Sequence, residues 1–425
     1  MRRMVLVLCG CVGAVPLGWA DVPEQRVETL TQEVQQLRQM VEQLRSTVQI
    51  QQQHITELER ANTQPRLVAG APPAPAVPSG GAGGANLSAF NPEIGVVADM
   101  LGRLSESSKD GGGNDKLSVR EVELIFGHPI DPYSRFDSTI TFSDFENPDI
   151  EEAYITHWGL PGEIKAKVGR MRPKIGKASA VHTDVLDTVD QPLVVQRYFG
   201  TEGLFRTGLE LTGFLPAPWT AVTHELTVGT MEGGVGEGGT LFGDTRRRPS
   251  FYTHLKNFWD LSDTSNVELG ATYLLGSKDA DAAYEVNALG LDATLVHYLT
   301  PTNKLKFQSE VYLQSRKESF NIAEDGTRTN FSKYPWGWYS LLDYRVSPRI
   351  GVGGRFDYVE PIDLAPARRA RPGETAWSGY LTFYQSEFSR WRLQFRHTDF
   401  AAGGDDNTIF AQGTVAIGVH KHQLQ

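Results

Sequence analysis

The sequence predicts an all-β fold class, a 16-stranded antiparallel transmembrane β-barrel preceded by a periplasmic α-helical coiled coil. Three observations lead to this prediction. Apolar and polar residues alternate in runs of roughly ten residues, as in strands with one face in lipid. The connections between these runs alternate between short and long. The chain also begins with the pattern of an export signal.

Composition narrows the class of protein. The 425 residues carry a net charge of −10 and 10% aromatic residues, and they include only two cysteines. Mild acidity argues against a nucleic-acid partner, because phosphate binding needs a basic surface. Both cysteines, Cys9 and Cys11, precede the expected cleavage point. The mature chain would therefore have no disulfide, thiolate metal site or cysteine nucleophile.

Residues 1–20 are interpreted as a signal peptide. Arg2 and Arg3 form the charged start, an apolar stretch follows, and Gly18-Trp19-Ala20 provides small residues around a cleavage site. A short transmembrane anchor is the alternative. It is weaker because the apolar run is below the ~18 residues that a spanning helix needs.

Residues 21–60 are predicted to form a coiled coil, because apolar residues repeat at heptad spacing. The expected core residues are Val27, Leu30, Val34, Leu37, Val41, Leu44, Val48, Ile55 and Leu58. A single amphipathic helix lying on another surface is the alternative. β-Branched residues at the first core position and Leu at the second favour two strands in parallel coils. Residues 61–88, rich in Pro and Gly, are expected to be a linker.

Residues 89–425 are predicted to be the barrel. Seven short connections, such as "HPIDPY" and "GLPG", are dense in turn-forming residues, and longer polar connections separate the resulting hairpins. Seven hairpins and one unpaired strand at each end amount to sixteen strands. An even number places both ends on one side, as bacterial outer-membrane barrels require.

The stretch "KLKFQSEVYLQSR" (304–316) shows the alternation clearly, with Leu305, Phe307, Val311 and Leu313 on one face. A soluble sandwich could also show this pattern, but the export signal and the unequal connections favour lipid outside and water inside. Strand parity then predicts which charged residues line a pore, and cations and anions nearly balance among them. The pore-lining candidates are Lys165, Lys167, Lys304, Lys306, Glu310, Arg316, Arg355, Asp357, Arg392 and Arg396.

The connection 173–205 is the candidate for a constriction, because a loop of this length in a compact domain usually has a function. Its charged candidates are Lys174, Lys177, Asp184, Asp187, Asp190 and Arg197. Opposed charges there would create a transverse field that sorts solutes. The alternative is an external loop that lies over a neighbouring subunit. The three aspartates could also share one helix face and hold Ca²⁺, although they lack the pattern of a known calcium loop.

Five stretches carry a resemblance to a known group of proteins. They are "FNPEIGVVADM", "SVREVELIFGHPIDPYSRFD", "EEAYITHWGLPGEIKAKVGRMRPKIG", "HLKNFWDLSDTSNVELGATYLLG" and "SEFSRWRLQFRHTD". With these stretches the chain resembles outer-membrane porins of the phosphate-selective porin O and P superfamily. The resemblance implies a sixteen-stranded porin, commonly trimeric, with an N-terminal helical segment in the periplasm. Some relatives are labelled zinc-regulated or TonB-dependent receptors, which would need a much larger plug than the coil and linker expected here.

The function expected is an outer-membrane porin for passive diffusion of small hydrophilic or charged solutes, with no chemical step and no cofactor or metal. Alternatives are a barrel-anchored structural tether that uses the coiled coil and, less strongly, a substrate-specific metal- or TonB-linked receptor. An outer-membrane enzyme comes last, because no catalytic constellation stands out. Expected partners are outer-membrane lipid and lipopolysaccharide, other copies of the chain (a trimer by resemblance), and peptidoglycan or a periplasmic protein through the coil.

Overall fold

The computed structural model describes residues 92–106, 116–144, 147–217, 221–233, 241–242, 248–278, 284–322, 328–362 and 369–418. The predicted signal peptide, coiled coil and linker lie outside these residues. Within the described ranges, no helix has the length and apolar character needed to cross a bilayer.

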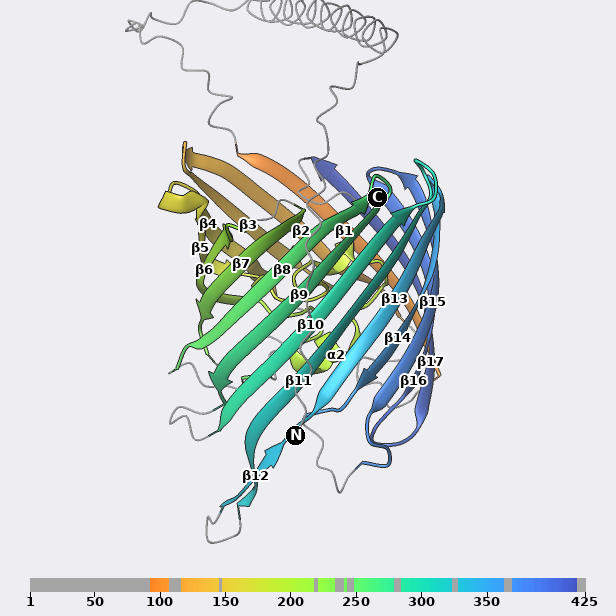
Figure 1. Ribbon diagram of the computed structural model, residues 1–425. Helices are drawn as coiled ribbons and strands as arrows, with labels where there is room; N and C mark the ends of the chain where they lie inside the picture. Colours follow the sequence, from red (N-terminus) through yellow and green to blue (C-terminus); the bar gives the residue numbers. More distant parts are fainter. Residues whose placement is uncertain are drawn as a thin grey trace, which may run out of the picture. The chain divides into compact units, whose positions relative to one another are not determined.

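The described part of the chain forms one closed antiparallel sheet (Figure 1). Each strand pairs with its neighbours in sequence, and β1 pairs with β17 to close the ring, from Gly95 opposite Gly418 to Ser105 opposite Thr408. The strands are β1 (Glu93–Ser105), β2 (Lys116–Asp131), β3 (Ser134–Phe142), β4 (Asp149–His157), β5 (Lys165–Met171), β6 (Arg206–Phe214), β7 (Val222–Met231), β8 (Ser250–Ser262), β9 (Ser265–Ser277), β10 (Glu285–Tyr298), β11 (Lys304–Ile322), β12 (Arg328–Lys333), β13 (Trp336–Ser347), β14 (Ile350–Val359), β15 (Glu374–Ser386), β16 (Ser389–Asp399) and β17 (Asp405–Gly418).

These elements make a barrel of sixteen strands, which confirms the predicted number. β12 and β13 are two parts of one strand, interrupted at Tyr334 and Pro335, and both pair with β11. Proline has no backbone N–H to donate, so a break in the ladder at this position is expected. Closure of the ring removes the free sheet edges that an open sheet of this size would expose.

The two faces of the strands have the predicted character. In β11, Leu313 is 45% exposed on the outer face, whereas Glu310 and Tyr312 on the inner face are each 1% exposed. The same arrangement recurs around the ring. Exposed outer leucines include Leu209 of β6, Leu269 of β9, Leu291 of β10, Leu342 of β13, Leu381 of β15 and Leu393 of β16. A continuous apolar outer surface of this kind is typical of a membrane barrel.

The seven predicted short connections are hairpin turns. They join β2 to β3, β4 to β5, β6 to β7, β8 to β9, β10 to β11, β13 to β14 and β15 to β16. The β4–β5 turn contains the 3₁₀ helix η2 (Pro161–Glu163), in which Gly162 has a φ of +74°. This left-handed conformation favours glycine.

Two bulges change which residues face inward. Asp99 of β1 pairs with Glu121 of β2 and the next pair is Met100 with Val119, so that Arg120 is the extra residue. In β4 the pairing with β3 skips Glu151 in the same way. A bulge inserts one unpaired residue and locally overrides strict alternation. Arg120 and Glu151 therefore contact inward-facing residues, although strict alternation along the strand would place both side chains on the outer face.

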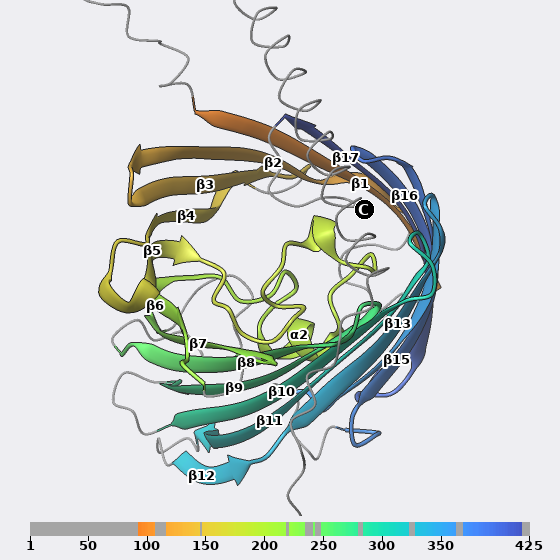
Figure 2. The same cartoon turned by 45° about the horizontal axis from the view of Figure 1, so that its top comes forward.

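The connection between β5 and β6 carries the main apolar core. It includes η3 (Thr183–Val185) and the short helix α2 (Leu193–Tyr198). Buried residues of this connection pack in one cluster with inward side chains of the strands, and Figure 2 draws the connection within the ring of strands. The cluster includes Ile175, Leu193, Val194, Val195, Tyr198 and Phe199 from the connection, and Tyr252, Leu274, Tyr312 and Tyr339 from the strands.

Candidate functional site

The connection 172–205, called the inner segment below, is attached to the strands through polar contacts. Its most densely bonded residue is Asp190, which accepts hydrogen bonds from Arg355 (3.2 Å), Arg396 (2.6 Å) and Gln394 (2.7 Å). Burial acts to raise the pKa of Asp190, but the positive charges of Arg355 and Arg396 outweigh burial and hold its pKa below the usual range. Asp190 is therefore a charged anchor between β14 and β16.

A second set of contacts lies just before Asp190. Lys306 of β11 donates to the Asp187 carboxylate at 2.8 Å, and Arg392 of β16 donates to the backbone carbonyl of Thr188 at 2.9 Å. Burial raises the pKa of Asp187, but the charge and hydrogen bond of Lys306 outweigh burial and lower it overall. The backbone carbonyl of Asp184 accepts a hydrogen bond from Arg390. Strands far apart in sequence thus hold consecutive residues of the inner segment.

The first part of the inner segment contacts β7, β9, β10 and β11. The backbone N–H of Ala178 donates to Glu310 of β11 at 2.6 Å, and Tyr339 donates its hydroxyl to the same carboxylate at 2.6 Å. Lys174 contacts Glu225 of β7 at 3.3 Å. Lys177 pairs with Glu268 of β9 and lies 3.7 Å from Asp292 of β10.

The last part of the inner segment contains α2, and α2 is attached to the strands through its side chains and its first backbone N–H group. The backbone N–H of Leu193 at the start of α2 donates to the Asp357 carboxylate of β14 at 3.0 Å. An acceptor is expected there, because the first N–H groups of a helix have no partner within it. Arg197 in the last turn pairs with Glu374 of β15 at 2.7 Å. Tyr198 donates to the backbone carbonyl of Glu360 at 3.1 Å.

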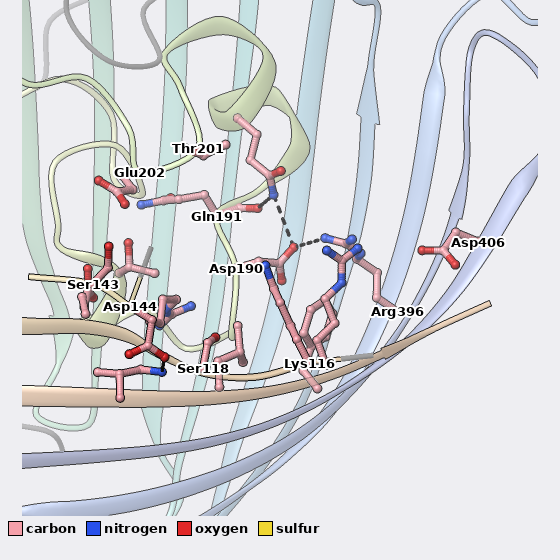
Figure 3. Close-up of a pocket in the computed structure, with 18 of the residues that line it drawn as sticks. Lys116, Ser118, Ser143, Asp144, Asp190, Gln191, Thr201, Glu202, Arg396 and Asp406 are labelled. Carbon is pink, nitrogen blue, oxygen red and sulfur yellow. Dashed lines mark hydrogen bonds and ion pairs between the residues drawn. The ribbon is translucent and has the colours of Figure 1, made fainter. Parts of the chain in front are cut away.

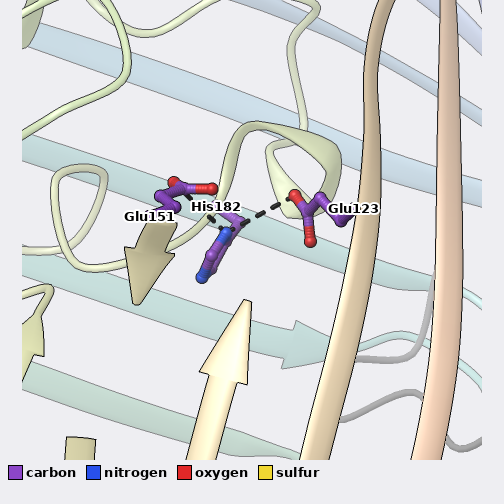
Figure 4. Close-up of side chains that lie close together, drawn as sticks. All are labelled: Glu123, Glu151 and His182. Carbon is purple, nitrogen blue, oxygen red and sulfur yellow. Dashed lines mark ion pairs between the residues drawn. The ribbon is translucent and has the colours of Figure 1, made fainter. Parts of the chain in front are cut away.

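His182 lies among three carboxylates, two of which, those of Glu123 and Glu151, are drawn in Figure 4. Its Nδ1 is 3.5 Å from Glu123 Oε1 of β2 and 3.4 Å from Glu151 Oε1 of β4. Its Nε2 is 3.1 Å from Glu152 Oε2. Burial acts to lower the pKa of His182, but the negative charge of Glu123 and the contact with Glu152 outweigh burial and raise its pKa to about 10. Arg172 also pairs with Glu151.

The structure places all ten predicted pore-lining residues on the inward face, and half of them are buried. Glu310, Arg316, Arg355, Asp357 and Arg392 are at most 3% exposed. Four of these contact the inner segment, and Arg316 donates to the backbone carbonyl of Leu241 at 2.7 Å. Lys165, Lys167, Lys304, Lys306 and Arg396 are partly buried. Their role in lining a pore stays a prediction.

The six charged residues predicted for the inner segment have separate partners. Asp187 pairs with Lys306, and Asp190 pairs with Arg355 and Arg396. Of the three aspartates, only Asp184 lies in a helix, the single turn η3. The idea that the three aspartates share a calcium site is wrong, because Asp187 and Asp190 pair with different strands and the described residues that could hold a metal ion do not include the three aspartates. That the inner segment narrows a water-filled channel stays a prediction.

Several contact residues were missed by sequence reasoning. Arg120 donates to Val189 O at 2.5 Å and pairs with Asp99, and Glu151 pairs with Arg172. Both belong to bulges, which the alternation pattern does not show. His182 was missed because nothing in its neighbourhood along the chain distinguishes it. Its partners come from β2 and β4, which only the folded ring brings to it.

A cavity of about 640 Å³ lies between the inner segment and strands β1, β2, β16 and β17 (Figure 3). Asp190 and Arg396 face each other at its border. Its charged lining is mixed in sign. The cations are Arg103, Lys116, Arg120, Arg197 and Arg396, and the anions are Glu121, Asp144, Asp190, Glu202 and Asp406. Of the ten predicted pore-lining residues, Arg396 alone is in this lining, so the balance of charge predicted for the wall stays a prediction.

Comparison with known proteins supports the fold. No protein-family model matches the chain. A protein of Aquifex aeolicus described as uncharacterized is 26% identical over 346 residues, which are 72% of this chain and 73% of that protein. The outer membrane channel DcaP of Acinetobacter baumannii is 11% identical, with a TM-score of 0.51 over 77% of this chain and 96% of that one. OprB of Pseudomonas putida is also 11% identical, with a TM-score of 0.49 over 79% and 97%.

The likeness to DcaP concerns the fold. It agrees with the sixteen-stranded closed ring and the apolar outer surface described above. The fold is a closed sixteen-stranded antiparallel β-barrel similar to that of the outer membrane channel DcaP.

Proposed function

We propose that this chain is an outer-membrane porin through which small hydrophilic or charged solutes diffuse passively. The observation that carries the proposal is the cavity between the inner segment and β1, β2, β16 and β17, inside a ring whose outer face is apolar. Because lipid surrounds such a ring and charged groups line its inside, we expect a water-filled route through it. In this proposal the inner segment narrows the lumen, and solutes pass along the cavity at one side of it.

Charge selection follows from the lining of the cavity. Because cations and anions occur there in equal number, we propose weak selectivity that depends on the dipole of the solute more than on its net charge. Of the predicted pore-lining residues, Arg396 lines the cavity and is proposed to meet solutes there. Lys165, Lys167 and Lys304, which are partly buried and outside the lining of the cavity, are proposed to meet solutes elsewhere along the lumen. The buried Arg355 and Asp357 instead hold the inner segment.

The predicted coiled coil adds an assembly role to the proposal. Residues 21–60 would join or orient subunits in the periplasm, or contact peptidoglycan there. A trimer is proposed from the resemblance to porins. Lipopolysaccharide and lipid would surround the apolar outer face.

A structural tether is the second candidate, and one observation favours it. The inner segment covers wall charges such as Glu310 and Arg392, and its apolar residues pack against Tyr312 and Tyr339. A barrel closed by its own core would anchor the coil without passing solutes.

Single-channel conductance in planar bilayers separates these functions. Ser118 lines the cavity, whereas its neighbour Leu117 is 82% exposed on the outer face. Ser118→Trp should lower the conductance by filling the cavity, and Leu117→Trp should leave it unchanged. If the purified parent chain, inserted and folded, shows no conductance steps, the porin proposal is rejected and the tether is favoured.

A further inference from the structure

We propose that Glu123, Glu151 and His182 form a binding site for a divalent transition-metal ion such as Zn²⁺. Glu123 comes from β2, Glu151 from β4 and His182 from the inner segment, and the three side chains converge in Figure 4. Their nearest ligand atoms all lie within 4.8 Å of one another, and all three residues are buried. This proposal does not depend on whether the barrel conducts.

The distances in this cluster suit metal ligands better than hydrogen bonds. His182 Nδ1 is 3.5 Å from Glu123 Oε1 and 3.4 Å from Glu151 Oε1. A charge-assisted hydrogen bond would be about 2.7–2.9 Å long. Zinc bonds of about 2.0–2.2 Å in tetrahedral geometry place neighbouring ligand atoms roughly 3.3–3.6 Å apart. Both separations from His182 Nδ1 fall in that range, and the two carboxylate oxygens lie within 4.8 Å of each other.

The Glu123 carboxylate provides an independent indication. Glu123 is 2% exposed, and its Oε1, directed at His182, has no hydrogen-bond partner among the described residues. A buried carboxylate oxygen without a hydrogen bond is costly, because burial removes its water. A metal ion bound at this oxygen would offset that cost.

Formal charge also agrees with a divalent ion. His182 directly contacts three carboxylates, those of Glu123, Glu151 and Glu152, and the guanidinium of Arg172 contacts one of them. Metal ligation requires deprotonated imidazole, so binding would release the proton of His182, and these groups would then have a net charge of −2. One divalent cation would bring that sum to zero.

The neighbouring residues resemble the surroundings of protein-bound zinc. Glu152 Oε2 lies 3.1 Å from His182 Nε2, the arrangement in which a carboxylate orients an imidazole ligand and selects its tautomer. Arg172 pairs with Glu151 Oε1, the oxygen that lies 3.4 Å from His182 Nδ1, and so orients that carboxylate. Imidazole with carboxylates favours ions such as Zn²⁺ over Ca²⁺ or Mg²⁺, which prefer oxygen ligands alone.

A metal at this position would have a structural consequence. β2 and β4 are separated by β3 in the ring, and His182 belongs to the inner segment. One ion would therefore connect the inner segment to two separate strands. Glu151 reaches the site because of the bulge in β4.

Metal binding can be tested on the full chain in detergent, stripped with a chelator and then titrated with ZnCl₂ by calorimetry. The parent chain should bind one Zn²⁺ with high affinity. His182→Gln and Glu123→Gln should each weaken that binding by more than about tenfold, and Glu152→Gln by about tenfold. His254→Gln and Glu210→Gln are matched controls, because both residues are buried inward-facing groups outside the cluster. Heat-dependent gel mobility would verify that each variant is folded.

Two results would overturn the proposal. One is Zn²⁺ binding by folded His182→Gln that equals binding by the parent, since the ion would then be elsewhere on the chain. The other is an X-ray absorption spectrum of the Zn²⁺-loaded parent without an imidazole nitrogen, a measurement that needs no variant. Neither test involves conductance, so failure of the metal site and failure of the porin proposal are distinguishable.

Discussion

Arg355 of β14 donates hydrogen bonds to both the backbone carbonyl and the carboxylate of Asp190, at 2.7 Å and 3.2 Å, across 165 residues of sequence. Arg355 also donates to Asp357 on its own strand at 2.7 Å. The guanidinium is fully buried, so it relies on these acceptors for its hydrogen bonds. This relationship joins the inner segment to the ring and makes Asp190 the most informative position to change.

Asp190→Asn should loosen the inner segment. The substitution leaves Arg355 and Arg396 without their shared anion, and breaking a buried pair from one side costs about 3 kcal/mol. Faster hydrogen exchange of residues 186–198 and larger, noisier conductance are expected. Asp263→Asn, in the exposed β8–β9 turn, is the control and should change neither. Unchanged exchange in folded Asp190→Asn would contradict the anchoring role.

The inner segment should stay attached in mild acid. The pKa values of Asp187 and Asp190 lie below the ordinary 3.8, so their stabilising contribution is present above that pH and is lost as pH falls through the lowered values. The protection of inner-segment amides, that is, their exchange rate relative to the intrinsic rate at the same pH, should therefore be alike at neutral pH and near pH 5, and should fall only in stronger acid. The inner segment could instead loosen between neutral pH and pH 5, to the same extent in the parent chain and in Asp190→Asn. That result would show that groups other than Asp190 govern its attachment.

Gly176→Ala should destabilise the chain more than Gly162→Ala. Both glycines have positive φ, +57° and +74°, which costs a non-glycine residue about 1 kcal/mol. A Cβ at Gly176 would also collide with the Glu310 carboxylate and the Tyr312 hydroxyl, whereas one at Gly162 meets nothing within 4 Å. Thermal unfolding in detergent should separate the two by roughly 1–3 kcal/mol. Equal losses of stability in the two variants would mean that the Glu310 side chain moves away from the added methyl group without cost.

Leu291→Arg should destabilise the barrel in a bilayer. Leu291 is 48% exposed on the outer face of β10, and an arginine near the bilayer midplane costs about 2–4 kcal/mol. Leu299→Arg, in the β10–β11 turn, should cost at most about 1 kcal/mol, because the interface tolerates charge. Unfolding by denaturant in lipid vesicles measures both. Equal stability of the two variants would argue against lipid at this face.

Ion selectivity should follow the charges that line the cavity. Neutralising Arg103 and Lys116 together as glutamines should shift the reversal potential in a salt gradient towards cation selectivity, and Glu202→Gln should shift it in the opposite direction. The exposed Arg349, in the β13–β14 turn, provides the control Arg349→Gln, which should have no effect. Shifts of the reversal potential of the same size in all variants would mean that ions do not pass along this cavity.

Much of the fold could be predicted from local patterns. The faces of β11, the seven hairpin turns and the count of sixteen strands follow from alternation and turn residues, since both are properties of short stretches of chain. The partners of the inner segment could not be predicted in this way. Asp190 has acceptor capacity for several cations, and nothing near it in sequence selects Arg355 and Arg396.

Bulges limited the prediction of inward residues. Arg120 and Glu151 are the extra residues of two strand pairs, and a single inserted residue reverses the parity rule at that point. Both contact groups that belong to other parts of the chain: Arg120 reaches Val189, and Glu151 lies beside His182.

The sequence by itself determined which residues form strands, which face of each strand is apolar and where the short turns fall. Only the tertiary structure decided that charges predicted to meet water instead hold residues 172–205, and that Glu123, Glu151 and His182 lie together. The physical reason is one of range. Alternation and turn formation depend on covalent geometry within a few residues, whereas these contacts depend on ring closure, strand register and bulges, which join residues far apart along the chain.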